Sequence, residues 1–308
     1  MSDRAVFPQW ADGSIVTVGM FDGVHLGHRD ILRRVRDRAA EVGLPGILVT
    51  FRPHPLAIVN PAAAPMLLSP DAEQLDAIVD SGPLHVVVLP FTPDLAKYSA
   101  EAFVTHLLLD RYRMRELIIG YDHGLGRGRQ GDASVLTEIG ARRGFRVEVV
   151  PPTLDSIGAP ISSSDIRASI AHGDLDRAQR SLGRPYSFRG IVVPGEQRGR
   201  ALGYPTLNIE LGSARKLLPP GGVYAVRARS PRGTFGGMMN LGPRPTFGEF
   251  DPTLEVHLFD ASGDWYGDSV SIELIRRLRD TTRFEGVDAL VAQLGRDAAD
   301  ARLALTQA

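Results

Sequence analysis

The pattern of apolar residues changes once along this chain of 308 residues, and the change predicts two domains of different architecture. Up to about residue 150, short apolar runs alternate with amphipathic segments, which is typical of a doubly wound parallel sheet of the α/β class. After Gly183-Arg184-Pro185, strand-like runs follow one another with Gly, Pro and Asp turns between them, and a long helix is expected only over 286–305. This second pattern favours an antiparallel β-barrel with a C-terminal helix packed against it. We therefore predict domains 1–183 and 184–308.

The expected elements follow from the period of the apolar residues. The strands expected in the first domain are Ile15–Val18, Gly46–Phe51, His85–Pro90, Glu116–Gly120 and Arg146–Val150. The helices expected there are His28–Val42, Pro70–Ser81, Ala100–Asp110, Ala133–Arg143, a helix through Ala171 that Ser162-Ser163-Ser164-Asp165 caps, and Asp174–Ser181. The strands expected in the second domain are Tyr186–Val193, Thr206–Ile209, Gly222–Arg229, Phe235–Leu241, Leu254–Phe259 and Ser269–Leu274.

Composition excludes several classes of protein. Hydrophobic residues make up 43% of the chain and charged residues 23%, as in an ordinary soluble globular protein. The formal net charge of -1 argues against a general nucleic-acid binder, although a few local donors suffice to bind a small anion. There is no cysteine, so a disulfide, a thiolate nucleophile and a cysteine-ligated metal are all excluded. The first ten residues do not read as a signal peptide and no apolar run has the length of a membrane helix, so we expect a cytoplasmic protein without a membrane partner.

A glycine-rich segment directly follows the first expected strand. Gly19, Gly23 and Gly27 allow the backbone to approach a phosphate, and the start of the next helix supplies unpaired N–H groups. His25 and His28 are three residues apart, so on a helical turn both imidazoles can donate to a triphosphate and stabilise the charge of a departing pyrophosphate. A zinc site or a pair of surface histidines is the alternative interpretation.

The whole segment from Gly19 to His28 resembles the G-x-F-D-G-x-H-x-G-H signature of bacterial FAD synthetases, which are nucleotidyltransferases. The resemblance implies a Rossmann-like first domain. It also implies that the nucleotide is bound by Gly19, Phe21, Asp22, Gly23, His25 and His28.

Two further segments of the first domain resemble motifs of the same family, in the same order. Residues 50–55 resemble T-F-x-P-H-P; read alone, they are a strand end followed by prolines that exclude a helix. Residues 162–167 resemble I-S-S-T-x-I-R, which implies that Ser163, Ser164 and Arg167 meet the nucleotide and that Arg167 neutralises the leaving pyrophosphate. Read alone, this second segment is a capped helix with an exposed arginine.

One loop of the first domain departs from the family pattern. Residues 120–132 resemble D-F-x-F-G-x-x-x-x-G-D, but His123 and Leu125 stand at the two Phe positions. Asp122 is retained and is expected at the flavin. The sequence therefore does not predict how efficiently the first domain would adenylylate FMN.

A second glycine-rich loop, residues 195–208, opens the second domain. It is neither a Walker loop nor a protein-kinase glycine loop. Thr206 and Asn208 alternate along a strand, so both face one side and can offer oxygen atoms to Mg²⁺; a solvated strand face is the alternative.

This second loop resembles the G-R-x-L-G-x-P-T-x-N motif of bacterial riboflavin kinases, and the segments at 222–224, 240–247 and 255–260 resemble that family too. The resemblance implies that Glu255 is the base for the ribityl hydroxyl of riboflavin. It further implies nucleotide contacts from Gly195, Gly199, Arg200 and Gly203, and flavin contacts from Asn240, Arg244 and Thr246. Arg279-Asp280 resembles the start of R-D-E-x-x-F, with Thr281 in place of the usual glutamate.

Together, the two resemblances imply a bifunctional enzyme of flavin cofactor biosynthesis. It would phosphorylate riboflavin to FMN with ATP and Mg²⁺, and then adenylylate FMN to FAD with release of pyrophosphate. Its partners would be these small molecules; the oligomeric state is not predicted. Three alternatives remain: a riboflavin kinase with a degenerate first domain, a non-catalytic flavin-binding regulatory or storage protein, and an adenylyltransferase for another phosphorylated metabolite.

Overall fold

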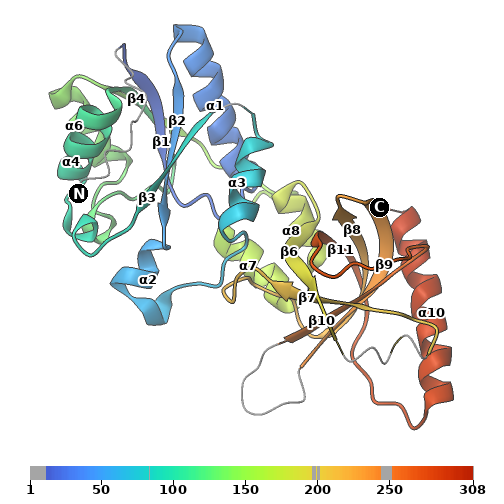
Figure 1. Cartoon of the computed structure of the whole chain (residues 1–308). Coiled ribbons are helices and arrows are strands. Elements are labelled where there is room, and N and C mark those ends of the chain that lie inside the picture. Colours follow the sequence, from blue (N-terminus) through green and yellow to red (C-terminus); the bar gives the residue numbers. More distant parts are fainter. Residues whose placement is uncertain (1–11, 83, 196–198, 200–201, 244–251, 308) are drawn as a thin grey trace. The chain divides into compact units, whose positions relative to one another are not determined.

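The chain forms two compact units, each described here by itself (Figure 1). The computed structural model describes residues 12–82, 84–195, 199, 202–243 and 252–307. Unit 1 comprises residues 1–65 and 74–161, and unit 2 comprises 66–73 and 162–308. The two units therefore divide the chain differently from the boundary at 183/184, which stays a prediction about the functional modules. The segment 66–73 interrupts unit 1 in the sequence, and we call it the strap.

Unit 1 is built on one parallel sheet of five strands in the order β3-β2-β1-β4-β5. Every residue of β1 is buried, as expected of a central strand that helices cover on both faces. The strands are β1 (Ser14–Val18), β2 (Gly46–Arg52), β3 (His85–Pro90), β4 (Met114–Gly120) and β5 (Arg146–Val150). All five predicted strands of this domain are thereby confirmed.

Helices cover both faces of this sheet. Figure 1 shows α1 and α3 on one face and α4 and α6 on the other. Apolar side chains of α1 and α3 pack in one cluster, and those of α4 and α6 in another. The α-helices are α1 (Leu26–Val42), α2 (Pro55–Val59), α3 (Asp71–Val79), α4 (Ala100–Phe103), α5 (Asp110–Tyr112) and α6 (Ala133–Arg143). A π-helix (Val104–Leu109) joins α4 to α5, and 3₁₀ turns lie at Pro61–Ala63, Leu95–Lys97 and Arg127–Arg129.

The expectation that prolines exclude a helix after β2 is wrong. Pro55 is the first residue of α2, where a proline removes only an N–H that has no intrahelical partner. The N-cap is His54, whose Nδ1 accepts from the N–H of Leu56 at 3.1 Å. A proline that would break a helix interior is compatible with the first turn, and the cap could not be recognised from residue type because histidine is not a typical N-cap.

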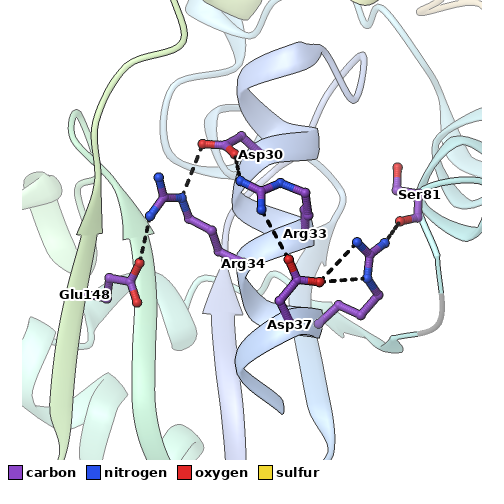
Figure 2. A network of polar contacts seen from close by, with 7 residues as sticks. Asp30, Arg33, Arg34, Asp37, Ser81 and Glu148 are labelled. Atoms are coloured by element: carbon purple, nitrogen blue, oxygen red, sulfur yellow. Dashed lines mark hydrogen bonds and ion pairs between the residues drawn. The ribbon is translucent and has the colours of Figure 1, made fainter. Parts of the chain in front are cut away.

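A network of charged side chains runs along the outer face of α1 (Figure 2). Arg34 donates to Asp30 at 3.3 Å and to Glu148 of β5 at 3.1 Å. On the other side of the helix, Arg36 donates to the carbonyl of Ser81 at 3.0 Å. Exposed ion pairs contribute little to stability, so the buried apolar face of α1, rather than this network, holds the helix on the sheet.

Unit 2 combines helices with a closed antiparallel barrel in the order β10-β7-β6-β11-β8-β9. Closure leaves no sheet edge exposed. The helices are α7 (Ser163–His172), α8 (Leu175–Leu182) and α10 (Val287–Thr306). The strands are β6 (Tyr186–Val193), β7 (Leu207–Leu211), β8 (Gly222–Ser230), β9 (Gly233–Pro243), β10 (Pro252–Leu258) and β11 (Ser269–Arg279). The predicted fold class is confirmed for both domains.

The C-terminal helix α10 packs on the outer face of the barrel. Its Ala301 and Ala304 lie in an apolar cluster with Ala225 of β8 and Met238 of β9. A buried ion pair fixes the helix in place: both oxygens of Asp297, which is 2% exposed, accept from Arg279 at 2.8 and 2.6 Å. The arginine of the R-D motif thus anchors a helix.

We expect Asp297→Ala to lower the free energy of unfolding of unit 2 by about 3 kcal/mol, because it leaves the Arg279 guanidinium without its buried partner. Urea unfolding monitored by circular dichroism measures this. Asp260→Ala is the matched control, since that carboxylate also pairs with an arginine, Arg302 at 3.0 Å, but is exposed. Equal midpoints for the two variants would contradict the anchoring role.

Candidate active sites

The sheet of unit 1 has a topological switch point between β1 and β4. The chain runs from β1 outward to β2 and β3 and then crosses back to β4, on the opposite side of β1. Ligands of such sheets bind outside the carboxyl ends of the strands at this point. The segment after β1 is the glycine-rich motif 19–28, and the segment after β4 is the loop 120–132. The fold thus brings the motif and Asp122 to the same edge of the sheet.

The backbone of the motif is held in an unusual conformation. Phe21, Gly23 and Val24 have φ values of 49°, 83° and 40°. A left-handed conformation is uncommon for any side chain and rare for a β-branched one, so Val24 is strained. Both Phe21 and Val24 are buried, and this packing holds the strained turn in place. Strain of this kind concentrates at functional sites.

His25 and His28 come together at the start of α1. His25 is the N-cap of this helix, and its Nδ1 accepts from the N–H of His28 at 3.3 Å. Because Nδ1 is the acceptor, a neutral His25 carries its proton on Nε2, which is therefore a donor. The two rings stack with centroids 3.7 Å apart. A side chain at Gly27 would press on the His25 ring, with its Cβ 3.3 Å from Cε1 and Nδ1.

Two residues that we did not select from the sequence hold the bend after β1. The hydroxyl of Thr50 on β2 donates to the carbonyl of Met20 at 3.4 Å, and the side-chain amide of Gln74 on α3 donates to the same oxygen. Gly19 donates to the carbonyl of Val49 at 3.0 Å. The T-F-x-P-H-P motif includes Thr50, so the sequence could have pointed to this residue. No motif includes Gln74.

The predicted phosphate contacts at the start of α7 belong to unit 2. Ser162 is the N-cap, as expected, and its hydroxyl accepts from the N–H of Asp165 at 3.2 Å. Ser163 and Ser164 lie in the first turn. Arg167 is half-buried, and its Nε donates to the carbonyl of Met66 in the strap at 2.9 Å.

The loop after β4 carries the two residues that replace phenylalanine. Leu125 is 5% exposed and packs in the core with Ala100 and Phe103, so it keeps the apolar role of its position. Burial lowers the pKa of His123 to about 4, and the charge of Arg129 acts in the same direction. Among the described residues the buried Nε2 of His123 has no hydrogen-bond partner.

In unit 2 the strand register brings three predicted site residues into one row. Glu255 of β10 pairs with Asn208 of β7 on one side and with Asn240 of β9 on the other. Directly paired residues project from the same face, so the three side chains are neighbours. The flanking Leu254 and Val256 are buried in the barrel, and strand alternation therefore puts this polar row on the outer face.

Gly195, the first residue of the glycine loop, lies close to the polar row. A Cβ at Gly195 would collide with the side-chain amide of Asn208, which would have to move. Gly199 lies against the carbonyl of Tyr204, where a Cβ would also collide. Gly203 has a φ of 81°, and Thr206 precedes β7 by one residue.

Three predicted site residues, Arg200, Arg244 and Thr246, lie outside the described residues. Within the described ranges no three His, Cys, Asp or Glu side chains gather as a metal-ion cluster. The oxygen donors of Thr206 and Asn208, with the Glu255 carboxylate beside Asn208, are of the kind that a hard divalent cation prefers.

Comparisons with known proteins find matches to both halves of the chain. A family model described as FAD synthetase matches residues 8–165, and one described as riboflavin kinase matches residues 182–305. The chain belongs to this bifunctional family. A bifunctional riboflavin kinase/FMN adenylyltransferase of Pseudomonas fluorescens is 38% identical over 94% of this chain and 92% of its own length. The proteins of the same name from Escherichia coli K12 and Bacillus subtilis are 34% and 32% identical over 94% of this chain and 92% and 91% of their own lengths. The predicted family and the predicted bifunctional enzyme are thereby confirmed.

A solved structure from Streptococcus pneumoniae shares this fold, with a TM-score of 0.83 and 32% identity over 92% of each chain. That protein is described as a macrolide-efflux protein. In the part of the present chain that the structure describes, no helix combines the length and the apolar character needed to cross a membrane.

We expect the stability of unit 1 to fall as the pH is lowered from about 6.5 to about 4. The folded-state pKa of His123 lies below its ordinary value, so the unfolded chain binds more protons in this window. The free energy of unfolding therefore falls by at most about 1.4 kcal/mol per pH unit, and is unaffected by this group above pH 6.5. Urea titrations of the wild type and of His123→Phe over this range measure the slope.

His123→Phe should make the free energy of unfolding less dependent on pH between about 6.5 and about 4. Tyr121→Phe, at an exposed position of the same loop, is the matched control and should leave the pH dependence unchanged, because a phenol does not titrate in this pH range. An unchanged slope in His123→Phe would show that another group causes the acid sensitivity.

Proposed function

We propose that this chain forms FAD from riboflavin in two consecutive steps, with phosphorylation at the polar row of unit 2 and adenylylation at the switch point of unit 1. The observation that carries the proposal is the register of the barrel, which sets Glu255 between Asn208 and Asn240. The functional boundary is proposed at residues 183/184. Substrates are riboflavin, FMN and ATP, with neither nucleic acid nor membrane as a partner, and the enzyme acts in the cytoplasm.

In the kinase step Glu255 is the general base. It takes the proton of the terminal ribityl hydroxyl while that oxygen bonds to the γ-phosphorus of ATP and the bond to the β–γ bridging oxygen breaks, which gives FMN and ADP. Gly195, Gly199 and Gly203 allow the loop to lie close to the phosphates, and Asn240 contacts the flavin. Arg200 completes the nucleotide contacts, and Arg244 and Thr246 those to the flavin.

Thr206 and Asn208 hold the divalent cation, which we propose to be Mg²⁺. Their neutral oxygens suit this hard cation, which keeps several waters and needs few protein ligands. When bound with ATP, the cation neutralises charge on the phosphates. Because Gly195 has no side chain, the Asn208 amide keeps its present position beside the loop.

In the adenylyl transfer a phosphate oxygen of FMN bonds to the α-phosphorus of ATP, and pyrophosphate leaves. His25 donates from Nε2, since its Nδ1 is occupied by the N–H of His28. His28 and Arg167 stabilise the charge of the pyrophosphate, and Asp122 contacts the flavin. Gly19, Phe21, Asp22 and Gly23 form the turn that receives the nucleotide, with Ser163 and Ser164 adding hydroxyl donors.

One assay separates this proposal from its alternatives. The purified chain is incubated with riboflavin, ATP and Mg²⁺, and riboflavin, FMN and FAD are separated by chromatography over time. We expect FMN to rise first and FAD to follow. Accumulation of FMN alone indicates a kinase with a degenerate first domain, and unchanged riboflavin indicates a flavin-binding regulatory protein.

Glu255→Gln is expected to lower the rate of riboflavin phosphorylation by roughly 10²–10⁴, because it keeps the shape of the side chain and removes the base. The same preparation should adenylylate supplied FMN at the wild-type rate. Glu273→Gln, on β11, is the matched control and should keep both activities. Parallel loss of both activities in Glu255→Gln would contradict a role confined to the kinase step.

His28→Ala is expected to lower FAD formation by roughly 10²–10³ by removing a donor from the developing charge, while FMN still accumulates. His172→Ala, near the end of α7, is the control and should not change either rate. Metal analysis of both proteins accompanies the assay. Stoichiometric zinc in the wild type that is lost in His28→Ala would replace the phosphate role with a metal role.

A further inference from the structure

The strap is joined to the barrel unit by paired backbone groups. The N–H of Leu67 donates to the carbonyl of Arg215, and the N–H of Leu217 donates to the carbonyl of Leu67, both at 2.8 Å. These two bonds form a parallel bridge opposite Lys216. Leu68, the next residue of the strap, is 1% exposed. The start of the strap therefore lies alongside residues 215–217 at this isolated bridge.

A buried lysine closes this contact. The side chain of Lys216 is 1% exposed, and its ammonium group donates to three oxygens of the described residues. Two belong to the strap, the carbonyl of Leu68 at 2.7 Å and a carboxylate oxygen of Glu73 at 2.6 Å, and the third is the carbonyl of Ser187 at 2.5 Å. An ammonium group has three N–H donors, so these three oxygens accept from all of them. The buried charge is thereby compensated.

The two ends of the strap make further contacts in the same unit. The second carboxylate oxygen of Glu73 accepts from the backbone N–H of Arg189 on β6 at 2.9 Å. The carbonyl of Met66 accepts from Arg167 of α7 at 2.9 Å. The strap is thus held at its first, second, third and last residues by groups that the barrel and α7 supply.

The residue type at position 216 is itself informative. Of the 35 Lys and Arg residues in the chain only Lys97 and Lys216 are lysines. A guanidinium group spreads its donors in a plane, whereas an ammonium group is a compact point with three rotatable donors. Acceptors that surround one point from strand β6, the strap and the start of α3 therefore favour lysine.

We propose that residues 66–73 are the occupant of a docking surface on the barrel, formed by Ser187, Arg189 and 215–217, and that Lys216 is the residue that locks them there. The unit that carries the kinase residues is then made of two separate pieces of chain, one of which lies inside the FAD synthetase match at 8–165. This inference rests on packing alone and stands independently of the proposed reactions.

Amine labelling of the intact protein tests the docking directly. The wild type is treated briefly with acetic anhydride and digested, and acetylation of Lys216 is measured against Lys97, whose side chain is 73% exposed. We expect Lys97 to react and Lys216 to be protected. Glu73→Ala should raise labelling of Lys216 by about tenfold or more, since it removes a charged acceptor from the lock.

Glu138→Ala, an exposed glutamate of α6, is the matched control and should leave Lys216 protected. Circular dichroism verifies that each variant is folded. Should Glu73→Ala unfold, Glu73→Gln takes its place, because it keeps one carbonyl acceptor. Unchanged protection of Lys216 in a folded Glu73 variant would overturn the proposal, since the barrel alone would then bury the lysine.

Hydrogen exchange tests the lock from the side of the strap. Lys216→Arg keeps the charge but not the compact donor geometry, so the amides of Leu67 and Leu217 should exchange about tenfold faster than in the wild type. Lys97→Arg is the control and should leave both amides unchanged. Wild-type exchange in Lys216→Arg would show that the backbone bridge alone holds the strap and that Lys216 is not its lock.

Discussion

Strand register is the constraint on which the chemistry of this chain depends. In a β-strand successive side chains alternate between two faces, so a slip by one residue exchanges the buried set for the exposed set. In β10 such a slip would turn Glu255 into the barrel interior and bring Leu254 and Val256 to the surface. An uncompensated carboxylate in an apolar core is costly, so the burial of these apolar neighbours fixes the position of the carboxylate between Asn208 and Asn240.

In unit 1 the order of the strands in the parallel sheet determines which segments form the site. The side-by-side placement of β1 and β4 determines which two segments meet at the carboxyl edge. The strained turn at Val24 then aims the start of α1, and His25 fixes the direction of its own ring by capping that helix. The buried sheet is rigid. It therefore holds the strained turn and the two stacked imidazoles in one arrangement.

The sequence predicted the elements well and their contacts poorly, for a physical reason. Buried strands of a parallel sheet are continuous apolar runs, so β1 to β5 were evident from hydropathy alone. The capping of α2 by His54 was missed because it depends on one side-chain rotamer. Motifs located Glu255, Asn208 and Asn240, but their adjacency needs the register of three strands, which no local pattern encodes. Gln74 was missed since its partner, Met20, is 54 residues away.

The strap shows why family modules and packing units differ in this chain. Lys216 and its acceptor at Leu68 are 148 residues apart in sequence, and bringing such distant segments together costs chain entropy before any bond forms. Each bond of the strap alone is too weak to offset that cost. The bridge, the ammonium group and Glu73 therefore act together, and an ammonium without all three acceptors would be an uncompensated buried charge. Because two of the three acceptors of Lys216 belong to the strap, the buried ammonium group keeps these partners only while the strap is in place.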